Sequence, residues 1–134
     1  MKSVTAIIER GTDCRYSVYI EDKEYPYGII GTGATVKEAE ADFMAGYEDM
    51  KSFVQESGGG FEEAEFVFKY DVPSFLQAFA FAFSLAGLER ITGINQKQLG
   101  HYISGFRHPS ATTVRKIESA IHSFSEQLGA IRFI

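Results

Sequence analysis

The stretch from Arg90 to Lys116 holds five basic residues and no acidic residue. Glutamine can pair with N6 and N7 of adenine, and lysine with O6 and N7 of guanine, so both side chains suit contacts to base edges in duplex DNA. Four side chains are candidates for base contacts: Gln96, Lys97, Gln98 and His101. Four that follow are candidates for phosphate contacts, which position a protein without reading sequence: Arg107, His108, Arg115 and Lys116.

Four predicted helices position these side chains, because apolar residues recur at helical intervals over Pro73–Phe83, Leu85–Thr92, Asn95–Ser104 and Ser110–Leu128. Between the second and third, Gly93 can end a helix in the left-handed conformation, Ile94 can fill the core, and Asn95 can cap the next helix. Two short helices joined by such a tight turn predict a helix-turn-helix, whose second helix enters the major groove. A helical bundle with a polar surface is the alternative.

The segment LERITGINQKQLGHYISGFRHPS, from Leu88 to Ser110, resembles the Cro/repressor-like helix-turn-helix domain. The matching features are Gly93-Ile94 at the turn, Gln96 and Gln98 at the start of the third helix, Gly105 at its end, and Arg107 with Pro109-Ser110 before the last helix. The departures are Glu89 in place of a small residue, Gly100 inside the third helix, and Ser84-Leu85-Ala86 in place of the glutamine that often opens the second. The resemblance implies DNA binding by residues 73–128.

The N-terminal half has a different pattern. Strands are predicted over Val4–Glu9, Tyr16–Glu21 and Ala64–Tyr70, with a short one at Tyr27–Gly31 and a capped helix over Thr35–Glu56. The order β-β-β-α-β predicts an α+β domain, with a small antiparallel-type sheet and the helix on one face. Because Asp71-Val72-Pro73 marks a change from alternating to helical pattern, we expect one domain over residues 1–70 and a second over 71–134. The second should be all-helical over residues 73–128 and end in a C-terminal tail.

This order, with Gly33-Ala34-Thr35-Val36-Lys37-Glu38-Ala39 opening the helix, resembles the N-terminal domain of HicB-type antitoxins. The Pro-Gly-Cys that often precedes the helix there is replaced by Tyr27-Gly28-Ile29-Ile30. The resemblance implies a partial ribonuclease-H-like, non-catalytic domain. It also implies a cytoplasmic antitoxin that neutralises a small basic HicA-like ribonuclease toxin and represses its own operon by binding operator DNA.

Charge divides the chain in the same place. Residues 1–71 hold 7 Lys/Arg and 15 Asp/Glu, a net charge of −8, whereas residues 72–134 hold 6 and 3, a net charge of +3. Two surfaces with different partners are therefore expected. An alternative is a phage-type or metabolic repressor whose N-terminal domain senses a ligand or only dimerises. A third hypothesis is a nuclease with a two-metal cluster drawn from Asp13, Glu21, Asp22, Glu24 and Asp71.

We expect no catalysis, because those carboxylates fall in turns and at strand ends, and we expect no metal or cofactor. The single cysteine, Cys14, suits a reducing cytosol, and no apolar stretch is long enough to cross a membrane. The segment Ala130–Ile134 is apolar and alternating, which predicts that it packs across a dimer interface or adds to a sheet edge.

Overall fold

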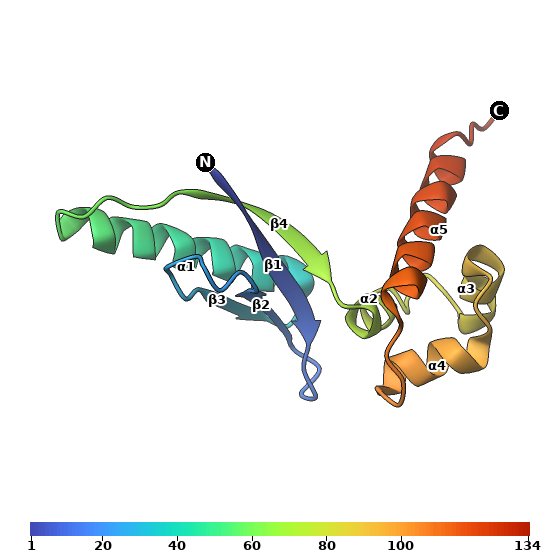
Figure 1. Cartoon of the computed structure of the whole chain (residues 1–134). Coiled ribbons are helices and arrows are strands. Elements are labelled where there is room, and N and C mark those ends of the chain that lie inside the picture. Colours follow the sequence, from blue (N-terminus) through green and yellow to red (C-terminus); the bar gives the residue numbers. More distant parts are fainter. The chain divides into compact units, whose positions relative to one another are not determined.

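The computed structural model describes all 134 residues, and its class is α+β, with one four-stranded sheet and five helices (Figure 1). The chain divides into two compact units, Met1–Ser74 and Phe75–Ile134. The sheet and the longest helix belong to the first unit. The second unit contains no strand.

The sheet of the first unit has the order β3-β2-β1-β4. Its strands are β1 (Lys2–Arg10), β2 (Tyr16–Ile20), β3 (Ile30–Gly33) and β4 (Ala64–Tyr70). The first three pair antiparallel, but β4 pairs parallel with β1, so the prediction of an antiparallel-type sheet was wrong for this strand. The reason is the intervening helix α1 (Val36–Glu56), which carries the chain back across the sheet so that β4 starts at the same end as β1.

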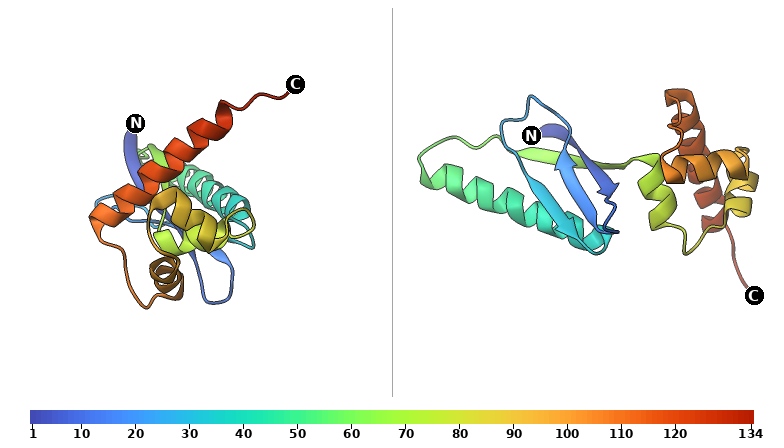
Figure 2. Two further views of the ribbon diagram at one scale, coloured as in Figure 1. Left: turned by 90° about the vertical axis from the view of Figure 1, so that its right-hand side faces the viewer. Right: turned by 90° about the horizontal axis from the view of Figure 1, so that it is seen from below.

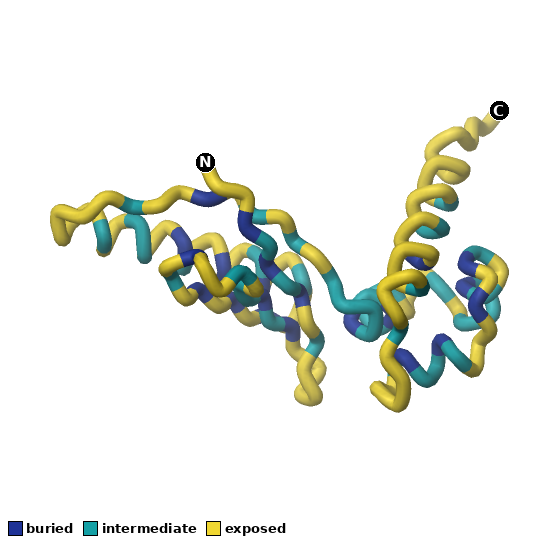
Figure 3. Tube along the Cα trace, viewed as in Figure 1, coloured by how far each residue is buried: buried dark blue, intermediate teal, exposed yellow.

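Helix α1 covers one face of this sheet (Figure 2). Thr35 caps its start, as predicted, since Glu38 N donates to Thr35 Oγ1 at 3.1 Å. The Glu38 carboxylate reaches one residue further back than in a capping box, and accepts from Ala34 N at 3.0 Å. The core lies between helix and sheet (Figure 3), where Phe43 is fully buried and meets the rings of Phe66 and Phe68 edge to face.

Strand β3 lies unusually close to α1, because its two inward residues are glycines. A Cβ atom on Gly31 would overlap Phe43 N and Ala39 O of the helix backbone, and one on Gly33 would lie 2.7 Å from Ala39 N. The strand begins at Ile30, three residues later than the predicted Tyr27. Packing explains the shift, since the ring of Tyr27 stacks on that of Phe61. This contact keeps the residues between Tyr27 and Ile30 in a loop.

Four helices form the second unit or lead into it: α2 (Val72–Ala78), α3 (Leu85–Thr92), α4 (Gln96–Ser104) and α5 (Ala111–Gly129). The first is shorter than the predicted Pro73–Phe83. After it, Ala82 N and Phe83 N both donate to Phe79 O. These residues form a non-helical turn, so the helix does not continue to Phe83. The turn is required because Ser84 must be extended to cap α3.

Candidate nucleic-acid interface

Helices α3 and α4 are joined by only three residues. Gly93 ends α3 in the left-handed region, with φ 76° and ψ 6°, where a side chain would be strained. Asn95 then caps α4, since its side chain accepts a hydrogen bond from Gln98 N at 2.9 Å. Ile94 between them is buried. All three residues therefore have the local roles that the sequence predicted for them.

A buried threonine, for which the sequence predicted no role, holds this turn in place. Thr92 Oγ1 donates to Leu88 O at 2.7 Å and accepts from Ile94 N at 3.2 Å. The hydroxyl thus links the last turn of α3 to the residue that plugs the core. A serine or threonine directly before Gly-Ile is the signal that could have identified it.

The inner side of α4 is formed by Leu99, which is completely buried, and Tyr102. Two of the four candidate base contacts, Gln96 and Lys97, are exposed at the start of the helix. Gln98 is half-buried, and its Nε2 donates to the Tyr102 hydroxyl at 3.0 Å. One of the four candidate base contacts is therefore held by a tyrosine that is itself buried.

Glu89, the acidic departure noted in the sequence, has a defined structural role. Its carboxylate accepts hydrogen bonds from Gln96 N at 3.1 Å and from Gln96 Nε2 at 3.4 Å. It therefore satisfies a backbone donor at the start of α4, where negative charge is favourable. Because an amide nitrogen carries two donors, Gln96 retains one N–H and its carbonyl oxygen for another partner.

The four candidate phosphate contacts are all exposed. Arg107 and His108 lie in the loop between α4 and α5, and Arg115 and Lys116 lie in the first two turns of α5. Lys116 extends over the α3–α4 turn, where its Nζ is 3.6 Å from the position a Cβ would take on Gly93. Arg107, Arg115 and Lys116 form no ion pair with a carboxylate. Their charges are therefore available to a polyanion.

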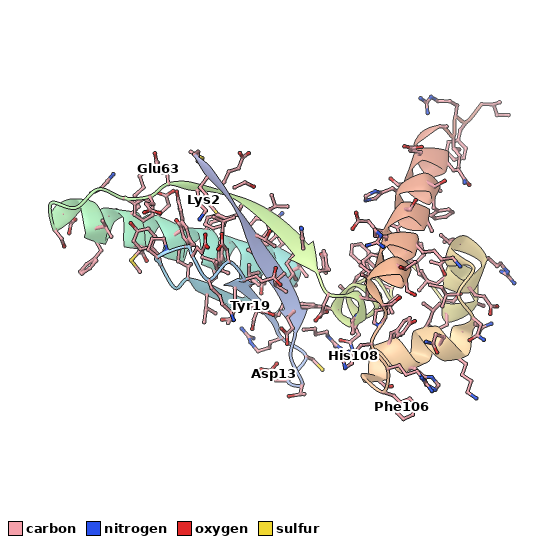
Figure 4. All side chains as sticks on the ribbon, viewed as in Figure 1. Lys2, Asp13, Tyr19, Glu63, Phe106 and His108 are labelled. Atoms are coloured by element: carbon pink, nitrogen blue, oxygen red, sulfur yellow. The ribbon has the colours of Figure 1, made fainter.

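An exposed aromatic ring accompanies them in the same loop. Phe106, labelled in Figure 4, is 70% exposed. Its ring centroid is 4.9 Å from that of His101, and the Arg107 guanidinium carbon lies 5.6 Å from the centroid of the Phe106 ring. His101 is half-buried, and its Nδ1 is enclosed without a hydrogen-bond partner. The sequence predicted an exposed position on the helix for His101. In the structure its ring packs against Phe106 instead.

The carboxylates of the nuclease hypothesis stabilise separate turns of the first unit. Asp13 accepts from Arg15 N at 3.0 Å, and Asp71 accepts from Ser74 N at 2.8 Å. Asp22 accepts from Glu24 N and forms an ion pair with Lys2 at 3.6 Å. No group of three or more His, Cys, Asp or Glu side chains comes together in a way that could hold a metal ion.

None of the five helices combines the length and the apolar character needed to cross a bilayer. Comparisons of the chain with protein-family models, with curated proteins and with solved structures found no match.

Proposed function

We propose that α3, the turn and α4 form a DNA-binding helix-turn-helix, with α4 lying in the major groove. The observation that carries the proposal is the arrangement of α4: a buried inner side at Leu99 and Tyr102, and an exposed start at Gln96 and Lys97. The unpaired cations around this helix support it, because phosphate contacts supply most of the affinity for DNA.

In this proposal Gln96, Lys97 and Gln98 contact base edges, where side chains at the start of a recognition helix reach. Arg107 and Lys116 contact phosphates on either side of the groove. Phe106 joins them as a contact to a sugar or to a thymine methyl group, since its exposed ring has no polar atom to pair. His101 acts through Phe106, by holding that ring in place.

We further propose that the first unit is a HicB-like, partial ribonuclease-H-like domain that binds a small basic toxin, a HicA-like ribonuclease that cleaves mRNA. The whole chain is then a cytoplasmic, non-enzymatic antitoxin and a repressor of its own operon. Support comes from the β-β-β-α-β order and from the net charge of −8 over residues 1–71, which favours fast association with a basic partner. The hydrogen bonds by which Asp13, Asp22 and Asp71 each stabilise a separate turn support binding over catalysis.

Binding to the DNA upstream of its own gene tests the first proposal. We expect a dimer to bind an inverted repeat whose half-sites are centred about 10 base pairs, or ~34 Å, apart or at a multiple of that spacing. Gln96→Ala or Gln98→Ala should weaken binding to the correct site by about 1–3 kcal/mol and relax preference at one base pair. Fluorescence anisotropy with the repeat and a scrambled duplex measures both. Variants that bind every duplex as the parent does would show that α4 does not read sequence.

Co-expression with the product of the neighbouring gene, followed by co-purification, tests the second proposal. We expect a complex with a small basic protein, loss of its ribonuclease activity, and an association rate that falls steeply with added salt. The fragment Met1–Ser74 should suffice for both. Binding by the full chain but not by the fragment would move the toxin contact to the second unit and contradict the HicB-like assignment.

A further inference from the structure

The carboxylate of Glu89 binds two donors of the same glutamine. Its two oxygens accept from Gln96 N at 3.1 Å and from Gln96 Nε2 at 3.4 Å. Glu89 is itself fixed at the end of α3, since its backbone carbonyl accepts from Gly93 N at 2.8 Å. No ion pair competes for its carboxylate oxygens. The exposed side chain of Gln96 is therefore held from the neighbouring helix.

This contact decides which way the side-chain amide of Gln96 points. An ionised carboxylate accepts hydrogen bonds and donates none, so Nε2 and not Oε1 must face Glu89. Because the same carboxylate also binds the backbone nitrogen of Gln96, it lies on the main-chain side of the amide. The groups left at the tip of the side chain are Oε1, which accepts, and one N–H, which donates.

Only one base presents the complement of this tip in the major groove. Adenine has a donor at N6 for Oε1 and an acceptor at N7 for the N–H. Guanine has two acceptors, N7 and O6, so Oε1 would face another lone pair, while thymine offers one acceptor and cytosine one donor. A free glutamine amide can turn over to adapt to guanine. The amide of Gln96 cannot do so without placing Oε1 against the carboxylate of Glu89.

We propose that Glu89 is a positioning residue that makes Gln96 select adenine over guanine at one base pair of the bound site. The inference rests on the proposed function, because it takes α4 as the reading helix, and it deepens that function by naming the base. Glu89 also places a negative charge at the start of α4, where a helix otherwise attracts an anion such as phosphate. It therefore lowers the affinity for DNA of any sequence while it sharpens the choice of one base.

Selection of sites from randomised duplexes by the full chain, with Gln96→Ala in parallel, identifies the base pair. We expect an adenine that the parent prefers over guanine about tenfold or more and that Gln96→Ala no longer selects. Glu89→Gln keeps the size of the side chain but lets the amide of Gln96 turn over. The preference should then fall to about twofold or less. The affinity for a scrambled duplex should rise about two- to fivefold, because a negative charge is removed from the start of α4.

Two further variants separate orientation from charge. Glu89→Asp keeps the charge but is one methylene shorter, so it should lose the adenine preference without gaining affinity for scrambled DNA. Glu118→Gln removes an exposed carboxylate from α5 and is the matched control, which should keep the parent's preference for adenine. Circular dichroism checks that the variants are folded. In the free protein, both N–H resonances of Gln96 should shift in Glu89→Gln and stay unchanged in Glu118→Gln.

A parent that selects guanine, or no particular base, through Gln96 would overturn this inference and leave the helix-turn-helix in place. A Glu89→Gln variant that keeps the full adenine preference, or Gln96 resonances that do not respond to it, would do the same. A chain that selects no sequence at all would overturn the proposed function, and the selection of adenine with it.

Discussion

At the scale of single residues, the hydroxyl of Tyr102 deserves a separate test, because it fixes one candidate base contact without being exposed itself. Tyr102→Phe retains the buried ring and removes the hydrogen bond to Gln98 Nε2. If Gln98 reads a base, we expect the preference at that base pair to fall by about 0.5–1.5 kcal/mol, the usual net value of one hydrogen bond. Competition anisotropy with singly substituted duplexes measures it.

The Gln98→Ala background provides the control for Tyr102→Phe. With no amide to hold, the same tyrosine substitution should leave the preference unchanged, so the double-mutant cycle isolates the pair. An equal effect of Tyr102→Phe in both backgrounds would mean that the hydroxyl acts through the fold of α4 and not through Gln98.

A second residue-scale prediction concerns Tyr19, on the face of the sheet opposite α1. Burial, and then its hydrogen bond to Glu9 at 2.8 Å, raise the pKa of Tyr19 to about 12. Because the raised pKa favours the neutral phenol in the folded state, its contribution to stability is complete below pH 10 and is lost as the pH rises towards 12. Glu9→Gln should lower this pKa, although burial keeps it above the ordinary value.

Tyr25 is the internal reference for that titration. Burial and neighbouring groups other than Glu9 raise its pKa to about 12 as well, so Glu9→Gln should not change it. NMR of ring-labelled tyrosine resolves the two. A Tyr19 pKa that is the same in the parent and in Glu9→Gln would show that the carboxylate does not contribute.

At the scale of elements, the contact between β3 and α1 depends on glycine. Gly31→Ala places a methyl group against the backbone atoms Phe43 N and Ala39 O, which cannot move without separating the strand from the helix. We expect the free energy of unfolding of the first unit to fall by about 2–3 kcal/mol or more. Urea denaturation followed by circular dichroism gives the value.

Gly28→Ala is the matched control, because a Cβ there meets nothing within 4 Å and the residue is exposed. Its effect should stay within about 0.5 kcal/mol. If both substitutions cost the same, the close approach of β3 to α1 would not explain the loss of stability.

At the scale of the whole molecule, the two halves carry opposite charge, with −8 over residues 1–71 and +3 over residues 72–134. The affinity for any duplex should therefore depend on salt through the second half alone. Arg107→Ala or Lys116→Ala should weaken binding to specific and scrambled DNA alike, and each should reduce the slope of log affinity against log salt by about one unit. Titrations at several salt concentrations measure the slope.

Lys37→Ala removes an exposed cation from α1 in the acidic half and serves as the control, since the slope should not change. A slope that falls equally in all three variants would mean that any exposed cation of the chain contributes to the attraction of DNA, and not only those around α4. The proposed arrangement of phosphate contacts would then be wrong.

Features whose hydrogen bonds close within about four residues were predictable from the sequence. Thr35, Ser84, Asn95 and Ser110 each cap a helix through a backbone N–H three residues later, and Gly93 ends α3 in the left-handed conformation. Side-chain chemistry and spacing alone determine such contacts. The bounds of α3, α4 and α5 consequently agree with prediction to within one residue.

Tertiary structure decided what depends on residues far apart in the chain. The parallel pairing of β4 with β1 follows from the path of α1, and the role of Gly31 appears only once Phe43 and Ala39 lie against it. In the second unit, a carboxylate from α3 binds Gln96, and Phe106 covers His101. Helical periodicity predicts which side of α4 faces outward, but it carries no information on which neighbouring element then occupies that side, because this depends on how the helices pack.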